Sequence, residues 1–313
     1  MNILYAGTPN SSAEILKYLA QNDSINVKGV ITQPDKAGKR GKKLNDSPVS
    51  LMANSYDLDL FKPHKLNNKD FKEKIKILEV DFLIVVAYGK ILPKWLLELP
   101  SVSSINIHFS LLPKYRGASP IQSALLNGDK ETGITFIEMS EKLDSGNIIS
   151  TEKTKIFMDD NKVKLETRLT GMSIKKINNV LIESAKQNKS SIKQDDSNAS
   201  YCQKILKVDS ITNFNDTSIN IFNKFRAFIE WPGLAFYHND TLIKIHGLEV
   251  LDQINTNKPG TIYKFDSTGL YINTIDSVIG ITHLQLPNRN IISSSDAFNS
   301  YKDFFTLKYF LAI

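Results

Sequence analysis

The first half of the chain alternates short apolar runs with amphipathic segments. The apolar runs are rich in β-branched residues and end at glycine, proline or polar residues, as buried strands do. They cover residues 3–5, 27–31, 82–87 and 102–108. Between them, apolar residues recur at helical spacing, for example at Phe71, Ile75 and Leu78. Strands that alternate with helices predict a doubly wound, mostly parallel α/β sheet, whose ligands bind beyond the carboxyl ends of the strands.

The pattern changes in the second half of the chain. Residues 165–185 have the spacing of a longer amphipathic helix, and residues 187–199 are polar without apolar periodicity, as a linker would be. After Val208, short apolar runs separated by turn-forming residues favour a small β-barrel-like domain. We therefore expect an α/β domain, a linker and a β-barrel-like domain over residues 1–186, 187–207 and 208–313.

The composition of the 313 residues narrows the class of protein. A hydrophobic share of 41% with 23% charged residues is ordinary for a soluble globular protein, and no apolar run approaches the roughly 20 residues of a membrane helix. The N-terminus reads as a first strand and not as a signal peptide. Cys202 is the single cysteine, which excludes an internal disulfide and a cysteine-based metal site. We therefore expect a cytoplasmic protein that does not bind a membrane.

The charge favours an anionic partner. The net charge is +6, and the basic excess lies in residues 1–207. Five cations stand close together, with two glycines, after the second predicted strand: Lys36, Lys39, Arg40, Lys42 and Lys43. A solvated loop is the usual structure for such a segment. The alternative is an arm that clamps a phosphate backbone, because closely spaced cations displace condensed counterions there.

The first turn between strand and helix, Ala6-Gly7-Thr8-Pro9, argues against a nicotinamide cofactor. A dinucleotide fingerprint requires three glycines in the pattern GxGxxG at this place. Only Gly7 is present, and Pro9 occupies the position of the second glycine. The turn is therefore expected to begin a helix, with proline near its first position.

Residues 104–121 form the segment most indicative of chemistry. Asn106 and His108 alternate on one predicted strand, so both side chains point to the same face near its carboxyl end. An amide that donates hydrogen bonds and an imidazole that holds a proton suit a developing oxyanion. An Asn-x-His pair alone is weak support, because a buried histidine is more often structural, but a long polar loop follows this pair.

Asp144 follows the predicted strand 133–139 and is flanked by turn-forming residues. Such an aspartate often forms an Asx turn. The functional interpretation is a carboxylate held against His108, which orients the imidazole and favours its charged form.

These residues resemble the folate-dependent formyltransferases. Asn106, His108 and Asp144 fall where that family has its Asn-x-His and Asp signature, and SLLPKYRGASPI (110–121) and LDSGNI (143–148) are close to its full pattern. Four further segments resemble the members that act on methionyl-tRNA: AGTP (6–9), PDKAGKRGKKL (34–44), YCQKI (201–205) and FRAFIEWPGLA (225–235). The chain departs from the family pattern at Asn10, Ser11, Lys39 and Ser119. The resemblance spans nearly the whole chain.

The resemblance implies a fold and an activity. The fold would be a Rossmann-like catalytic domain, a linker and a small C-terminal OB-like β-barrel domain that contacts tRNA. The activity would be transfer of the formyl group of 10-formyltetrahydrofolate to the free amino group of initiator methionyl-tRNA, without a metal, for translation initiation. Asn106 and protonated His108 would stabilise the oxyanion, and Asp144 would hold His108. The enzyme would act as a monomer.

The resemblance also implies binding residues. The folate loop would be Ser110, Leu111, Leu112 and Pro113. The pteridine pocket would be lined by Val86, Ala87, Tyr88, Gly89, Ile91 and Leu92. The acceptor stem of the tRNA would be bound by Lys36, Lys39, Arg40, Lys42 and Lys43. The linker would add Lys204 and Lys207, with Lys224 and Arg226 as further candidates.

Four alternatives remain open from the residues. A relative that formylates a small amine, such as a nucleotide-sugar or glycinamide ribonucleotide, would not need the basic segment or the domain after Val208. A formyltetrahydrofolate hydrolase would share the three site residues without the basic segment. A non-catalytic RNA-binding protein would not need all three of those residues, and a dehydrogenase is disfavoured by the first turn.

Overall fold

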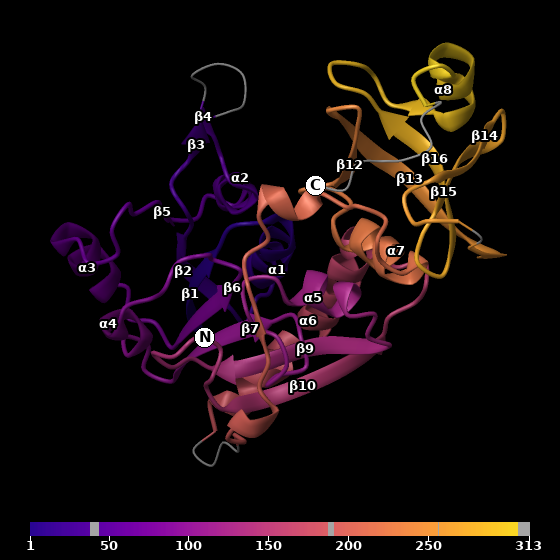
Figure 1. Ribbon diagram of the computed structural model, residues 1–313. Helices are drawn as coiled ribbons and strands as arrows, with labels where there is room; N and C mark the ends of the chain where they lie inside the picture. Colours follow the sequence, from indigo (N-terminus) through magenta and orange to yellow (C-terminus); the bar gives the residue numbers. More distant parts are fainter. Residues whose placement is uncertain (38–43, 187–190, 256, 306–313) are drawn as a thin grey trace. The chain divides into compact units, whose positions relative to one another are not determined.

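The computed structural model describes residues 1–37, 44–186, 191–255 and 257–305 (Figure 1). The chain divides into two compact units. Unit 1 comprises residues 1–120, 131–155 and 166–203, and unit 2 comprises residues 121–130, 156–165 and 204–313. The domain bounds expected from the sequence stay a prediction. Two short segments that precede the expected linker, 121–130 and 156–165, belong to unit 2.

Unit 1 is built on a seven-stranded sheet in the order β10-β9-β7-β6-β1-β2-β5. Five neighbouring strands pair in parallel, and β9 and β10 extend the sheet at one edge through antiparallel pairings of β7 with β9 and of β9 with β10. The strands are β1 Asn2–Gly7, β2 Asn26–Ile31, β5 Leu60–Phe61, β6 Phe82–Val86, β7 Ser103–His108, β9 Glu131–Glu138 and β10 Ile148–Lys155. From β1 the chain runs outward through β2 to β5, and then returns to add β6 and β7 on the other side. This confirms the predicted Rossmann-like, doubly wound sheet and places its switch point between β1 and β6.

The helices of unit 1 begin where local chemistry favours a start. In α2, Pro48–Ser55, Ser47 caps the first turn by accepting a hydrogen bond from the Ser50 amide, and Pro48 takes the first turn. In α3, Lys69–Lys76, Asn68 accepts from the Phe71 amide. The remaining helices are α1 Asn10–Ala20, α4 Lys94–Leu97 and α6 Lys162–Ser184, the last of which begins in a unit 2 segment. Two short strand pairs complete the unit: β3 Lys36–Ala37 with β4 Leu44–Asn45, and β8 Arg116–Gly117 with β11 Tyr201–Cys202.

The core of unit 1 lies on both faces of the parallel strands. All five residues of β6 are buried, as the continuous apolar run predicted for a strand covered on both faces. On one face, Leu83 and Val85 pack with Phe71 and Ile75 of α3. This rigid centre holds the carboxyl ends of β6 and β7 side by side, because the two strands pair in register from Phe82 with Ser103.

Unit 2 contains a six-stranded antiparallel sheet, which confirms that the chain after Val208 forms a small C-terminal β domain. Five strands follow the order β12-β13-β16-β15-β14, and β17 pairs with β16. Their bounds are β12 Leu234–His238, β13 Thr241–Ile254, β14 Ile262–Asp266, β15 Gly269–Asn273, β16 Ser277–Gln285 and β17 Ile292–Ser293. The sheet packs with α7 Ser218–Ala227 and α8 Ser294–Tyr301, and α5 Pro120–Leu126 belongs largely to this unit. Its core contains Phe214, Phe236 and Ile281, with Phe214 and Phe236 in edge-to-face contact.

Within the ranges that the structure describes, no helix combines the length and the apolar character that crossing a bilayer requires.

Candidate active site

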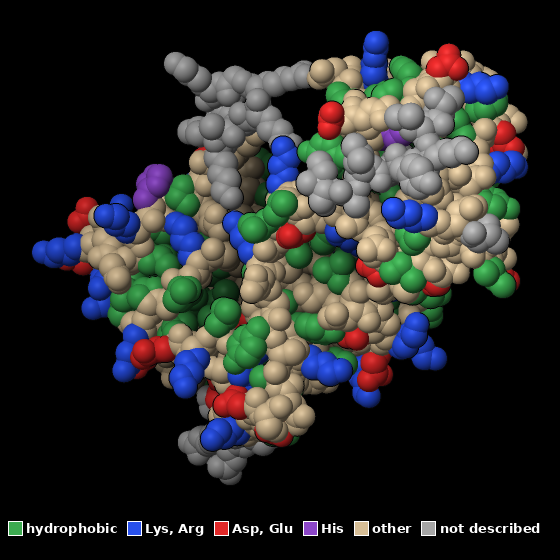
Figure 2. Space-filling model, viewed as in Figure 1, with side chains coloured by type: hydrophobic (Ala, Val, Ile, Leu, Met, Phe, Trp, Pro, Cys, Tyr) green, Lys and Arg blue, Asp and Glu red, His purple; other side chains and the backbone are tan. Residues whose placement is uncertain are grey.

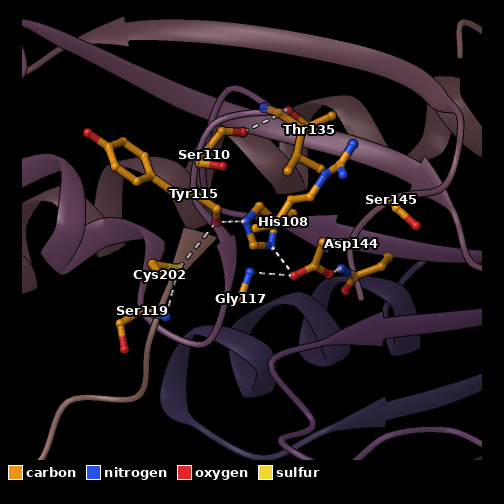
Figure 3. Close-up of polar contacts among 12 residues, drawn as sticks. His108, Ser110, Tyr115, Gly117, Ser119, Thr135, Asp144, Ser145 and Cys202 are labelled. Atoms are coloured by element: carbon orange, nitrogen blue, oxygen red, sulfur yellow. Dashed lines mark hydrogen bonds and ion pairs between the residues drawn. The ribbon is translucent and has the colours of Figure 1, made fainter. Parts of the chain in front are cut away.

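Strand β7 delivers two polar side chains to the carboxyl end of the unit 1 sheet. Asn106 and His108 are 9% and 5% exposed, and they lie on the same face because they are two residues apart on one strand. Figure 3 shows His108 facing Asp144, which comes from the turn between β9 and β10. The structure therefore brings together the three residues that the sequence analysis singled out.

The Asp144 carboxylate is the centre of the arrangement. Its Oδ1 accepts a hydrogen bond from Asn106 Nδ2 at 3.2 Å, and its Oδ2 accepts from the Gly117 amide at 2.8 Å. The same Oδ2 lies 3.6 Å from His108 Nδ1. Both side chains of this contact are largely buried, at 6% and 11% exposed, so solvent and salt would screen opposite charges on them weakly.

The second ring nitrogen of His108 has a partner within the loop that follows β7. His108 Nε2 lies 2.8 Å from the Tyr115 carbonyl oxygen (Figure 3). A carbonyl oxygen only accepts, so Nε2 carries the hydrogen of this bond. A doubly protonated ring would therefore find an acceptor at each nitrogen, Tyr115 on one side and Asp144 on the other.

Turn-forming residues at the site have specific geometric reasons. Asp144 adopts a left-handed backbone with φ 47°, which aspartate tolerates better than most residues. Gly117 has φ 127°, and a Cβ built there would lie 2.2 Å from the Cys202 carbonyl oxygen. At Gly146 a Cβ would lie 1.6 Å from the Glu138 carbonyl oxygen. Glycine at position 117 thus lets β8 lie close to β11, and glycine at position 146 lets the Asp144 turn lie close to the backbone of β9.

The predicted folate loop is braced from inside. Thr135 Oγ1 on β9 donates to the Ser110 carbonyl at 2.7 Å and accepts from the Leu112 amide at 3.2 Å. The Ser110 hydroxyl donates to the Lys114 carbonyl at 2.6 Å. Ser110 and Leu112 are buried, whereas Leu111 and Pro113 are partly exposed. The exposed members of the loop are therefore the ones with surface to offer a ligand.

The predicted pteridine segment begins at the carboxyl end of β6, next to β7. Val86, Tyr88 and Leu92 are buried, and Ala87, Gly89 and Ile91 are exposed, with Ile91 84% exposed. The Tyr88 carbonyl accepts from Thr8 Oγ1 at 3.0 Å and from Gln33 Nε2 at 2.8 Å, and burial raises the pKa of the Tyr88 phenol to about 12. Figure 2 shows hydrophobic side chains gathered over this part of unit 1, with the surface hollowed between them.

Only the two ends of the basic segment 34–44, residues 34–37 and 44, lie within the described residues. Lys39, Arg40, Lys42 and Lys43 lie outside the described residues, and Lys36 lies in β3. Next to the segment, Lys62 Nζ forms ion pairs with Asp35 at 2.8 Å and Asp46 at 2.6 Å. One cation thus ties together the two carboxylates that flank the β3–β4 pair.

The four cations named in the linker and unit 2 separate into two groups. Lys204 and Lys207 are exposed. Arg226 is 6% exposed and donates to Asn223 Oδ1 and to the Phe157 carbonyl. Lys224 donates to the Ile211 carbonyl, and burial lowers the pKa of its ammonium. Lys224 and Arg226 therefore serve the packing of unit 2 and are unsuited to bind RNA, because their head groups are already engaged inside the protein.

Sequence reasoning missed two residues that surround the site. Arg116 lies within the polar loop that attracted attention, but nothing in the sequence indicates that its guanidinium is buried, at 2% exposed. Gln194 lies in the stretch interpreted as a linker, yet it is 5% exposed and contacts the Asp144 turn. Neither has a sequence signal that marks it as buried, because Arg116 is one of several polar residues before Gly117 and Gln194 is one polar residue in a polar run.

Among the described residues, no group of three or more His, Cys, Asp or Glu is placed to hold a metal ion.

Comparisons with known proteins give the site its context. Residues 1–181 match the family described as formyl transferase, and residues 204–302 match its C-terminal domain. A methionyl-tRNA formyltransferase of Caldicellulosiruptor saccharolyticus is 38% identical and covers 96% of this chain and 97% of its own. One from Legionella pneumophila is 34% identical and covers 96% of both chains.

A solved structure has the same fold. The sugar 3N-formyltransferase WlaRD, crystallised in the presence of dTDP and 5-N-formyl-THF, superposes with a TM-score of 0.64. The match covers 93% of this chain and 99% of that one at 24% identity, so it speaks for the fold alone. With two family matches over most of the sequence and relatives at 34–38% identity over almost all of it, this chain belongs to the formyl transferase family, among the methionyl-tRNA formyltransferases.

Proposed function

We propose that this chain transfers the formyl group of 10-formyltetrahydrofolate to the free α-amino group of initiator methionyl-tRNA, as a monomer in the cytoplasm. The observation that carries the proposal is the grouping of Asn106, His108 and Asp144 at the carboxyl end of β7. Membership in the family supplies the donor and the acceptor, and the geometry supplies the chemistry that acyl transfer needs. The product is N-formylmethionyl-tRNA, which serves translation initiation.

The Asn106 amide is the direct donor to the developing oxyanion. When the neutral amine attacks the formyl carbon, negative charge gathers on the formyl oxygen. Asn106 Nδ2 has two hydrogens, and one of them binds Asp144 Oδ1. The other is directed away from this bond, where the formyl oxygen would accept it. Because Asp144 fixes the amide before the substrates bind, little reorganisation is required at the moment of reaction.

His108 acts chiefly through its charge in this arrangement. Its Nε2 hydrogen is bound to the Tyr115 carbonyl and its Nδ1 faces Asp144, so neither nitrogen is directed at a substrate. A protonated ring next to Asn106 stabilises the oxyanion electrostatically, and Asp144 and Tyr115 hold that ring in place. When the tetrahedral centre collapses, the carbon–N10 bond breaks, and the proton lost by the attacking amine passes to N10 of tetrahydrofolate.

Positioning of the large acceptor contributes the remaining part of the rate. Holding two reactants in the correct geometry lowers a barrier by about 7–11 kcal/mol. We assign this role towards the acceptor stem to Lys36, Lys39, Arg40, Lys42 and Lys43, supported by Lys204 and Lys207. The exposure of the last two leaves their ammonium groups accessible to phosphates.

Folate binding is assigned to the exposed parts of two neighbouring loops. Leu111 and Pro113 follow β7, and Ala87, Gly89 and Ile91 follow β6. These residues therefore follow the carboxyl ends of two adjacent parallel strands, the end of the sheet at which such folds bind ligands. The buried members of both segments, among them Ser110 and Tyr88, support the loops from beneath.

A formyl-transfer assay tests the proposal. 10-Formyltetrahydrofolate labelled in its formyl group is offered with charged initiator methionyl-tRNA, uncharged tRNA or glycinamide ribonucleotide in parallel. Label on the charged tRNA alone is expected. Label on the small amine, or free formate alone, would retain the oxyanion site but reject methionyl-tRNA as the acceptor.

A further inference from the structure

Arg116 is a buried cation that contacts the active site through an intermediary. Its guanidinium donates from both Nε and Nη2 to Gln194 Oε1, at 3.0 and 2.8 Å, and from Nη2 to Asp196 Oδ1 at 2.8 Å. Burying a charge is costly unless it is paired and hydrogen-bonded. The position is therefore occupied by arginine because these partners are present.

Gln194 joins this cation to the turn that carries Asp144. Its Nε2 donates to the Asp144 carbonyl at 2.8 Å and to the Gly146 carbonyl at 2.7 Å. With two bonds accepted from Arg116 and two donated to the turn, all four hydrogen-bonding positions of the amide are used. The orientation is also unambiguous, because a guanidinium only donates and a carbonyl only accepts.

Strand β8 thus holds the Asp144 turn at two places. Gly117 binds the carboxylate through its amide, and its neighbour Arg116 binds the backbone of the turn through Gln194. These contacts hold the turn in the left-handed backbone conformation of Asp144, which residues other than glycine adopt uncommonly. The support acts behind the carboxylate and leaves its oxygens directed at Asn106 and His108.

We propose that Gln194 and Arg116 are positioning residues for the reaction. They fix the 144–146 turn so that the Asp144 carboxylate meets Asn106, Gly117 and His108 at the distances observed. The inference rests on the proposed function, because it states how the site for that reaction is kept in register. Neither residue is assigned a contact with a substrate.

The test uses Gln194→Glu, which keeps the size of the side chain and its ability to accept from Arg116. A carboxylate has no hydrogen to donate, so both bonds to the turn are lost. A displacement of about 1 Å near a reacting centre costs about 10²-fold in rate. We expect kcat to fall by about that factor with little change in KM for either substrate.

Amide hydrogen exchange, followed by NMR, reads the position of the carboxylate without any substrate. The Gly117 amide, which binds Asp144 Oδ2, should exchange faster in Gln194→Glu. The neighbouring Ala118 amide, which binds the Cys202 carbonyl at 3.2 Å, should exchange as in the wild type. General unfolding would accelerate both amides, so the pair separates a local displacement from lost stability.

Two further variants complete the experiment. Asp196→Asn removes the charge of a partner whose side chain is 77% exposed and leaves Gln194 in place, so kcat should stay near that of the wild type. Arg116→Lys, made in the wild-type chain, keeps a cation that donates to Gln194. Its kcat should lie between that of the wild type and that of Gln194→Glu. Because Arg116→Lys retains the buried charge, it also covers the case in which Gln194→Glu does not fold.

Unaltered kcat and Gly117 exchange in folded Gln194→Glu would overturn the inference. So would a loss of kcat without faster Gly117 exchange, because the residue would then act on something other than the Asp144 turn. If the wild type itself forms no formylmethionyl-tRNA, the proposed function fails. Gly117 exchange would then still decide whether Gln194 positions the carboxylate.

Discussion

Asp144→Asn is the substitution whose effect follows most directly from the structure. The change keeps the size and shape of the side chain but removes its charge. The carboxylate accepts hydrogen bonds from Asn106 and Gly117 through different oxygens, whereas an asparagine offers only one acceptor oxygen. One of the two donors therefore faces an NH₂ group, which costs about 1–3 kcal/mol of folding free energy.

The larger effect is expected on turnover. The carboxylate lies 3.6 Å from His108 Nδ1. At an effective dielectric of about 20, opposite charges at such a distance attract by about 4 kcal/mol. If the protonated ring stabilises the oxyanion, removing its partner raises the barrier by a comparable amount, which corresponds to about 10³-fold in kcat. KM for both substrates should change little, because Asp144 is not assigned a contact with either.

The assay is steady-state formyl transfer to charged initiator methionyl-tRNA, with thermal unfolding recorded for each variant. Asp23→Asn is the matched control, since it makes the same chemical change at an exposed residue of unit 1. It should leave kcat unaltered. A folded Asp144→Asn enzyme with wild-type kcat would refute the proposal that Asp144 holds His108 for the reaction. It would also refute the proposal that a protonated His108 stabilises the oxyanion.

Four further predictions concern other parts of the chain. Asn106→Ala should lower kcat by about 10²–10³-fold, because one oxyanion donor is lost; full turnover in the same transfer assay would contradict the donor role. Arg40→Ala, in the segment outside the described residues, should weaken the use of tRNA at physiological salt with little change in KM for the folate, and equal activity would exclude it as a tRNA contact. Gly117→Ala should destabilise the protein by more than about 1 kcal/mol in thermal unfolding, because φ at this residue is 127° and the new Cβ would collide with the Cys202 carbonyl oxygen. Gly171→Ala is the contrasting variant: the new Cβ would lie in open space within α6, so the substitution should stabilise the protein by about 1 kcal/mol. Burial lowers the pKa of His238, so the stability that its neutral form contributes is present above about pH 6.5 and is lost as the pH falls towards the lower pKa of the folded state. His238→Gln should remove this part of the pH dependence of the unfolding free energy. An unchanged pH dependence would contradict the prediction.

Much of the local structure was readable from single segments. The alternation of Asn106 and His108 predicted that they share a face at the carboxyl end of a strand, because the side-chain period of a strand is two. The structure places them so on β7. The lack of the dinucleotide-binding glycines at Ala6-Gly7-Thr8-Pro9 could likewise be recognised from the sequence, because that motif consists of residues close together in the chain.

Other interpretations depended on distances that a sequence does not contain. Lys224 and Arg226 were candidates for RNA contact because they are basic. In the fold, both instead donate hydrogen bonds to carbonyl oxygens of unit 2. Their charge was visible in the sequence, but their burial was not. Gln194 was interpreted as part of a polar linker, although it bonds to the Asp144 turn 50 residues earlier.

The sequence by itself determined the order of strands and helices, the two kinds of domain and, through a motif spread along nearly the whole chain, the family. These features depend on local periodicity, on turn chemistry and on residue types at short spacing. Only the tertiary structure decided that the Asp144 carboxylate binds Asn106, 38 residues earlier, and the Gly117 amide, 27 residues earlier, and that Arg116 reaches the same turn through Gln194. The physical reason is that hydrogen bonds and ion pairs act over about 3–4 Å, and the folded sheet alone sets which distant residues come that close.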